Sequence, residues 1–142
     1  MLVVSDLMTE EVYALHETDT LRAARSLMSL ARIRHIPVVT AEGRFLGLLT
    51  HRDLLAATAS QLADLDEAQR REWDEAIPVG EVMRRDVTVA APGDSLRQAA
   101  ETLLRHKYGC LPVVENDRVV GILTESDFLR LAISLLEAAE EE

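Results

Sequence analysis

A threonine followed three residues later by an aspartate occurs twice, each time directly after a short apolar run: Thr50 with Asp53, and Thr124 with Asp127. Such a pair can form a capping box, in which the hydroxyl accepts from a first-turn N–H group and the carboxylate reaches back. The start of a helix also offers free N–H groups and a positive dipole end, which favour a bound phosphate. The two interpretations are compatible, and the spacing alone does not choose between them.

Basic side chains surround the first pair more densely than the second. Near the first pair they are Arg32, Arg34, His35, His51 and Arg52. In the second pair, Glu125 and Ser126 occupy the two intervening positions. Because an unpaired buried anion is costly, we expect the first site to tolerate more phosphates than the second. The alternative for each arginine is an ordinary solvated surface charge.

The sequence contains no recognisable catalytic or metal-binding motif. The four histidines lack the H-x-x-x-H spacing, and G-x-S-x-G, P-loop and G-x-G-x-x-G patterns are missing. We therefore expect a protein without enzymatic activity, with neither catalytic residues nor a metal site. The single cysteine, Cys110, precedes an apolar strand and is expected to be a small buried residue, with a pocket-lining thiol as the alternative.

The composition indicates an ordinary globular chain. It has 142 residues, a formal charge of −10 and 48% apolar residues, so it can bury a substantial core. The negative charge disfavours binding to nucleic acid or to anionic membranes. The N-terminus lacks a signal-peptide pattern, and no apolar run approaches the roughly 20 residues that span a bilayer. We expect a cytoplasmic location.

The chain contains two copies of one unit. At an offset of 75, Val4–Glu42 matches Val79–Asp117, and Pro37–Val39 is identical to Pro112–Val114. A deletion of one residue then shifts the offset to 74, which aligns the two Thr/Asp pairs with each other. The pairs are therefore equivalent positions of a repeat.

The sequence pattern of each copy predicts an extended lead-in, a helix, two short strands and a second helix. The first helices have apolar residues at helical spacing and begin behind Thr18-Asp19 and Gly93-Asp94-Ser95, which can cap them. The short apolar runs predict buried strands. The expected elements are helices over Leu21–Ala31, Leu96–Leu104 and Phe128–Ala139, and strands over Ile36–Val39, Phe45–Leu49, Leu111–Val114 and Val119–Leu123.

These elements predict an α/β (α+β) fold of two repeats related by a pseudo-twofold axis, each a small sheet packed with two helices. A copy of about 50 residues rarely buries enough apolar surface alone, so we expect the repeats to share one core. Repeat 1 is expected over residues 1–57, a helical linker over 58–77 and repeat 2 over 78–142. The linker carries a narrow apolar stripe formed by Leu62, Leu65, Trp73 and Ala76.

The ordered set of motifs, present twice, resembles the cystathionine-beta-synthase (CBS) domain family, and specifically a stand-alone tandem pair, or Bateman module. In the first copy the resemblance lies in Asp6–Thr9, Ile36–Val39 and Gly47–Leu54. In the second copy it lies in Glu81–Met83, Leu111–Val114 and Gly121–Phe128. Each short motif is common by itself, but their order and repetition are specific.

The resemblance implies an adenosine-containing ligand whose ribose hydroxyls bind the aspartate of each motif and whose phosphates lie by the threonine. The residues expected at the ribose and phosphates are Thr50, Asp53, Thr124, Asp127, Arg52, His51 and Ser126. Those expected at adenine are Thr9, Val12, Ala14, His35, Ile36 and Pro37 with Asp127, and Val87, Val89, Cys110, Leu111 and Pro112 with Asp53. Plain core packing is the alternative for each, and Tyr13 and Tyr108 are aromatic candidates for stacking on a base.

The resemblance further implies a regulatory module that binds AMP, ADP, ATP or S-adenosylmethionine in clefts between the repeats and signals by a conformational change. No cofactor is required, with Mg²⁺ as an optional companion of the nucleotide. The expected partners are a second copy, bound through the helices Leu21–Ala31, Leu96–Leu104 and Phe128–Leu136, and an unidentified effector protein. A dimerisation or protein-interaction module that binds no nucleotide is the alternative.

Overall fold

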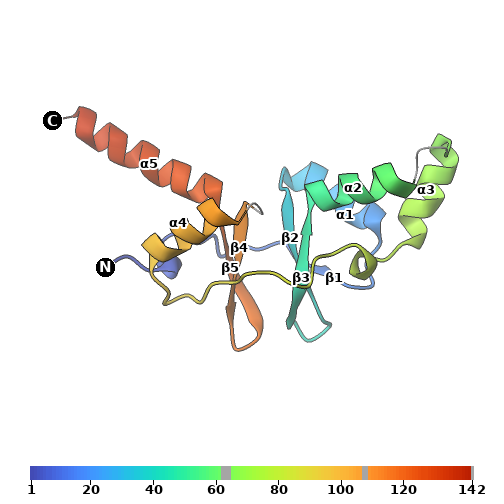
Figure 1. Ribbon diagram of the computed structural model, residues 1–142, viewed down its shortest axis with the longest axis horizontal. Helices are drawn as coiled ribbons and strands as arrows, with labels where there is room; N and C mark the ends of the chain where they lie inside the picture. Colours follow the sequence, from blue (N-terminus) through green and yellow to red (C-terminus); the bar gives the residue numbers. More distant parts are fainter. Residues whose placement is uncertain (62–64, 107–108, 142) are drawn as a thin grey trace. The chain divides into compact units, whose positions relative to one another are not determined.

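Residues Tyr13–Val87 form one compact unit, called the Asp53 unit here, around a small sheet (Figure 1). Two apolar strands pair antiparallel in this sheet, and a two-residue strand adds in parallel to the first of them. Most residues of the two longer strands are buried, as their apolar runs predict. The elements are β1 (Leu15–His16), α1 (Leu21–Ala31), β2 (His35–Val39), β3 (Phe45–Thr50), α2 (His51–Gln61), α3 (Glu67–Ala76) and the 3₁₀ turn η2 (Val79–Glu81).

Residues Met1–Val12 and Thr88–Glu142 form the second compact unit, called the Asp127 unit here. Its antiparallel hairpin repeats the β2–β3 pairing, and Ala90 forms a parallel bridge to Val113 where β1 pairs with β2 in the other unit. The computed structural model describes residues 1–61, 65–106 and 109–141. The elements of the unit are the 3₁₀ turn η1 (Val4–Asp6), α4 (Leu96–Arg105), β4 (Cys110–Glu115), β5 (Arg118–Thr124) and α5 (Glu125–Glu140).

The lead-in of each repeat belongs to the compact unit formed by the other repeat. In the Asp127 unit, Thr9 and Ile122 exchange two backbone hydrogen bonds of 2.9 Å each. In the Asp53 unit, Arg84 and Leu48 do the same at 2.8 and 2.9 Å. Each lead-in is thereby fixed along the last strand of a hairpin, next to the point where that strand turns into a helix.

The buried side chains form one cluster in each unit. The cluster of the Asp53 unit includes Val79 and Met83 from the second repeat, and that of the Asp127 unit includes Val4 from the first. Each cluster therefore takes side chains from both repeats, because the lead-ins are exchanged. The predicted α/β class, with small sheets packed against helices, is confirmed.

The expected cap of α1 is shifted by one residue. Thr20 is the N-cap, and its hydroxyl accepts from the Ala23 N–H at 3.2 Å. Asp19 lies one residue too early for this role, and its carboxylate instead accepts from the His16 N–H at 2.8 Å, which closes the turn after β1. In the other repeat Ser95 caps α4, as expected.

The segment expected as a helical linker contains α3, which packs on α1. Trp73 is half-buried against the core of the Asp53 unit, and Asp74 pairs with Arg25 of α1 at 2.8 Å. Leu62 of the expected apolar stripe and Tyr108 of the expected base contacts lie outside the described residues. Within the described ranges, no helix combines the length and the apolar character needed to cross a bilayer.

Candidate functional site

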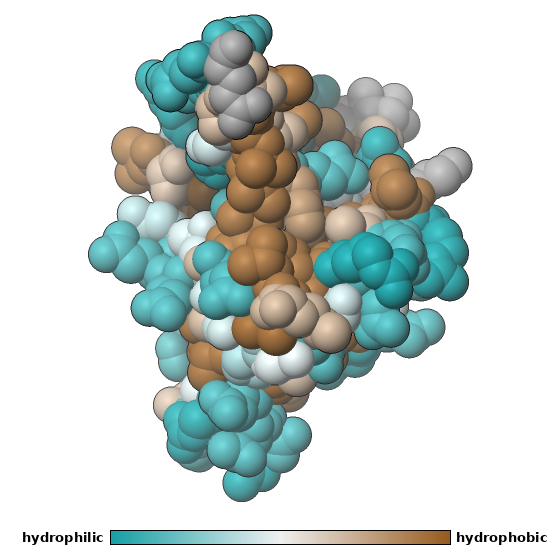
Figure 2. Space-filling model, turned by 90° about the vertical axis from the view of Figure 1, so that its left-hand side faces the viewer, coloured by the Kyte–Doolittle hydropathy of each residue, from teal (hydrophilic) through white to brown (hydrophobic). Residues whose placement is uncertain are grey.

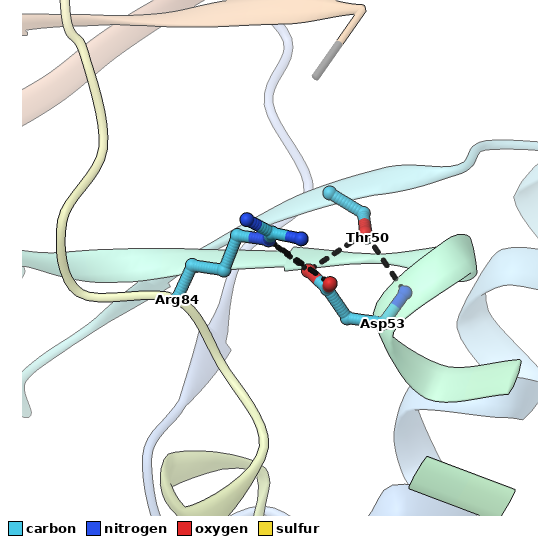
Figure 3. A network of polar contacts seen from close by, with 3 residues as sticks. All are labelled: Thr50, Asp53 and Arg84. Carbon is cyan, nitrogen blue, oxygen red and sulfur yellow. Dashed lines mark hydrogen bonds and ion pairs between the residues drawn. The ribbon is translucent and has the colours of Figure 1, made fainter. Parts of the chain in front are cut away.

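The first Thr/Asp pair lies at the junction between β3 and α2. Thr50 ends the strand with its side chain almost fully buried, and its Oγ1 accepts from the Asp53 N–H at 3.1 Å. The same hydroxyl donates to Asp53 Oδ2 at 2.8 Å (Figure 3). The hydroxyl thus caps the helix, and it also holds the carboxylate in a fixed orientation.

The Asp53 carboxylate is also bound by Arg84, from the lead-in of the second repeat (Figure 3). Arg84 Nε lies 2.9 Å from Oδ1 and 2.9 Å from Oδ2. The Asp53 side chain is 13% exposed and the Arg84 side chain 44%. This is a charge-assisted hydrogen bond to a mostly buried carboxylate, made by a cation that reaches solvent.

The second Thr/Asp pair is joined by different hydrogen bonds: the Thr124 hydroxyl donates to Asp127 Oδ2 at 3.3 Å, against 2.8 Å for the equivalent contact of the first pair. The Thr124 N–H donates to Asp127 Oδ2 at 2.8 Å, at the start of α5. The Thr9 hydroxyl donates to Asp127 Oδ1 at 3.2 Å, and Arg130 Nη1 lies 3.4 Å from the same oxygen. Asp127 is only 7% exposed. Its carboxylate is held by the N–H and hydroxyl of Thr124, by the Thr9 hydroxyl and, at a longer distance, by Arg130.

Thr9 and Arg84 occupy equivalent positions, 75 residues apart in the repeat. Each contacts the aspartate of the unit to which its lead-in belongs. The sequence motifs predicted a binding role for Thr9 but not for Arg84. The offset of the repeat aligns the two positions, which is the one sequence signal that could have identified Arg84.

An open pocket of about 520 Å³ lies between α1 and the first turn of α2. It is lined by Arg25, Met28, Ser29, Arg32, Ile33, Arg34, His51 and Leu54, and therefore includes three of the basic residues noted near the first Thr/Asp pair. Neither Thr50 nor Asp53 lines it. In the other repeat, the positions of Arg25, Arg34 and His51 hold Ala100, Gly109 and Glu125. The excess of positive charge expected for the first repeat is thus partly gathered in this pocket.

The residues nominated for the base are divided between the two units. His35 pairs with Thr50 across the β2–β3 hairpin, and Cys110 pairs with Thr124 across the β4–β5 hairpin. Thr9, Ala14 and Val89 are exposed, Val12 and Val87 are half-buried, and Ile36, Pro37, Leu111 and Pro112 are buried in their strands. The buried members could offer a base only their backbone groups, and the assignment of the whole set stays a prediction. Arg52 and Ser126 are exposed in the first turns of α2 and α5.

Cys110 is buried at the start of β4, as expected for a small core residue. Burial raises the pKa of its thiol from 9.0 to about 12, because the anionic thiolate loses hydration inside the protein. Among the described residues, no three His, Cys, Asp or Glu side chains lie close enough together to hold a metal ion.

Helix α5 carries an apolar stripe on its surface. Leu129, Ile133 and Leu136 follow one another at helical spacing, and each is more than half exposed. Figure 2 shows apolar side chains gathered in a band on the side of the molecule where the chain ends. An exposed apolar band of this kind is typical of an interaction surface.

Comparison with known proteins identifies relatives over nearly the whole chain. The CBS domain model matches residues 4–60 and 79–134. The AcuB protein of Vibrio cholerae is 43% identical over 100% of this chain and 98% of its own, with a TM-score of 0.82. The CBS domain-containing protein YhcV of Bacillus subtilis is 32% identical over 89% of this chain and 83% of its own length.

A structure with a bound nucleotide is also among the relatives. CBSX2 is a CBS-pair protein of Arabidopsis thaliana. In the structure of its complex with AMP, the CBSX2 chain shares 25% sequence identity with this chain and superposes with a TM-score of 0.79. The match covers 95% of this chain and 98% of the CBSX2 chain. The chain spans less than half the length of the first curated relatives: 42% of MJ1225 from Methanocaldococcus jannaschii and 23% of the homoserine O-acetyltransferase from Methanohalophilus mahii. With two matches of the family model and the fold of CBS-pair structures, this chain belongs to the CBS domain family.

Proposed function

We propose that this protein is a regulatory sensor that binds an adenosine-containing ligand at Asp53, at Asp127 or at both. One observation carries the proposal: in each unit, a threonine at a strand-to-helix junction orients a mostly buried aspartate, whose carboxylate bonds to a donor on a connecting segment. The ligand class is AMP, ADP, ATP or S-adenosylmethionine, and the binding of AMP by CBSX2 supports it. The proposed role is binding without catalysis, and Mg²⁺ is not required.

The chemistry of the two sites suits a ribose and its phosphates. An ionised carboxylate accepts hydrogen bonds from both vicinal hydroxyls of a ribose. The free N–H groups and the positive dipole end at the start of α2 and α5 favour a phosphate there. His51 and Arg52 add positive charge at the start of α2, whereas α5 begins with Glu125 and Ser126.

The signal would pass through the two connecting segments. Thr9 lies three residues before Val12, where the chain leaves the Asp127 unit, and Arg84 lies three residues before Val87, where it leaves the Asp53 unit. A ligand that takes over the carboxylate releases one of these two side chains. The equilibrium then moves toward the conformation that the ligand binds better, by an amount set by the difference in affinity.

A thermal-shift panel of adenosine, AMP, ADP, ATP and S-adenosylmethionine, with guanosine compounds as controls, tests the proposal. A ligand present at 100 times its dissociation constant should stabilise the protein by about 2.7 kcal/mol. Asp53→Asn and Asp127→Asn should each remove one binding event and retain the shape of the side chain. Asp86→Asn, which changes an exposed carboxylate of the connecting segment, should leave binding intact.

If no compound of the panel raises the melting temperature, the sensor proposal is rejected, and the alternative of an interaction module that binds no nucleotide remains. The same conclusion would follow if both aspartate variants, alone and combined, bound every ligand as the wild type does.

We also propose that the apolar stripe of α5 pairs with the same stripe of a second copy. An antiparallel pairing centred near Ile133 is self-complementary, because it brings Arg130 opposite Glu137 of the second copy twice. It would cover Leu129, Ile133 and Leu136, which are otherwise more than half exposed.

Replacing Ile133 by glutamate should break this pairing, because it places a charge at the centre of the apolar stripe on both copies. The molecular mass measured by light scattering after gel filtration should then fall from about twice the 15.8 kDa of one chain to that of a single chain. Ser134→Glu adds the same charge at the adjacent exposed position and should remain dimeric. A wild-type protein that elutes as a single chain at every concentration would contradict the proposal.

A further inference from the structure

We infer that Arg84 determines which ligands the Asp53 site accepts: it holds the carboxylate when no ligand is bound and turns to the phosphate when a phosphorylated nucleoside enters. The site would then select anionic adenosine derivatives over uncharged ones. This inference rests on the proposed role of Asp53 in binding ribose, and it adds a specificity-determining residue outside the Thr/Asp motif.

The oxygens of the Asp53 carboxylate already have donors. Oδ2 accepts from the Thr50 hydroxyl at 2.8 Å and from Arg84 Nε at 2.9 Å, and Oδ1 accepts from the same Nε at 2.9 Å. A sugar hydroxyl approaching this carboxylate therefore competes with the guanidinium (Figure 3). The competition is with a charged donor, whose hydrogen bonds are roughly twice as strong as those of a neutral one.

An uncharged nucleoside gains little in this competition. Its two hydroxyls replace the hydrogen bonds of Arg84 but not its positive charge, and the carboxylate is only 13% exposed. A mostly buried charge that loses its partner is strongly disfavoured. Adenosine alone is therefore expected to bind this site weakly.

A phosphorylated nucleoside offers Arg84 a new partner. The guanidinium forms two parallel hydrogen bonds with a phosphate as readily as with a carboxylate, so Arg84 regains an ionic partner, and this gain offsets the loss of its pairing with Asp53. The Arg84 side chain is 44% exposed, which leaves it room to move away from Asp53. Its backbone stays fixed by the two hydrogen bonds to Leu48, so the guanidinium remains near the site.

The second site of the same chain serves as an internal comparison. Thr9 holds the position of Arg84, and its backbone makes the equivalent two hydrogen bonds to Ile122. Its hydroxyl lies 3.2 Å from Asp127 Oδ1 and carries no charge. A ribose displaces this hydroxyl and leaves the ion pair of Arg130 with Asp127, at 3.4 Å, in place. We therefore expect a smaller preference for AMP over adenosine at the Asp127 site than at the Asp53 site.

Isothermal titration calorimetry with adenosine and AMP tests the inference in the Asp127→Asn background, which isolates the Asp53 site. With Arg84 present, AMP should bind at least about tenfold more tightly than adenosine, a difference of about 1.4 kcal/mol. Arg84→Thr should lower this preference at least about threefold, and the start of α2 with His51 and Arg52 accounts for any preference that remains. Arg84→Lys retains the charge and should retain the preference. Arg85→Thr, the adjacent residue, whose guanidinium lies 4.0 Å from the Glu17 carboxylate, is the matched control and should also retain it.

A reciprocal variant avoids dependence on the folding of Arg84→Thr. Thr9→Arg in the Asp53→Asn background should transfer the preference for AMP to the Asp127 site. A purely structural Arg84 would alter both affinities equally, so an unchanged ratio of the two affinities in Arg84→Thr would overturn the inference and leave the sensor intact. If no adenosine compound binds the wild type, the proposed function fails as well.

Discussion

Replacing Gly47 by alanine is expected to lower the free energy of unfolding by about 2–3 kcal/mol. A Cβ atom at this position would lie 2.3 Å from the Arg84 carbonyl oxygen and 3.2 Å from Met83 Sδ. That oxygen accepts from the Leu48 N–H at 2.9 Å, so the clash is with backbone held in place. Urea denaturation monitored by the fluorescence of Trp73, which packs on the core of the same unit, measures the loss.

Two other glycines provide matched controls. At Gly121, the equivalent position of the repeat, a Cβ would meet Met8 Sδ at 2.6 Å, and that flexible side chain can move. Gly121→Ala should therefore cost less than Gly47→Ala. At Gly93 nothing lies within 4 Å, so Gly93→Ala should change stability by less than about 0.5 kcal/mol. If Gly47→Ala were as mild as Gly93→Ala, the lead-in would not pair with β3 in solution.

The elements of the fold could be predicted because the information for them is local. The hairpin strands end within about one residue of the apolar runs, as β2 over His35–Val39 illustrates. The helices α1 and α4 follow their apolar periodicity, and each has a cap within one or two residues of the expected position. Each of these features depends on residues fewer than about five positions apart in the sequence.

The exchange of lead-ins could not be predicted from local patterns, because an extended segment has no periodicity that indicates its partner. Only the family resemblance, which grouped Thr9 with Asp127 and Val87 with Asp53, pointed to it. Residues 1–12 and 79–87 have short polar and apolar stretches that fit either repeat equally well. Only the backbone bonds to the hairpin strands establish where the lead-ins belong.

In the candidate sites too, the contacts between residues close in sequence could be predicted, and those between distant residues could not be predicted from the motif. The contact of Thr50 with Asp53 spans three residues, so the motif alone predicted it. The contact of Arg84 with Asp53 spans 31 residues and that of Thr9 with Asp127 spans 118. Both depend on the exchanged lead-ins. The expected inequality of the two sites was based on the basic residues beside the motif, whereas the nearest charged partner of Asp53 lies on the distant segment.

Alkylation of Cys110 at pH 8 is expected to be on the order of 1,000-fold slower in the folded protein than in the protein unfolded by urea. Only the thiolate reacts, and burial raises the pKa of this thiol from 9.0 to about 12, which lowers the thiolate fraction accordingly. Iodoacetamide labelling followed by mass spectrometry measures the rate. The double variant Cys110→Ala/Ser126→Cys places one thiol at an exposed helix start and should react rapidly without urea.

The same thiol makes the folded state sensitive to high pH. Well below pH 9.0 the thiol is almost fully protonated in both states, so it contributes almost no pH dependence to the free energy of unfolding. Between 9.0 and about 12 the unfolded chain releases the proton and the folded chain retains it, so stability falls as the pH rises. Cys110→Ala should show a shallower decline than the wild type over this range. Equal slopes, together with rapid labelling of the folded protein, would mean that the start of β4, next to Thr124 and the Asp127 site, is open to solvent.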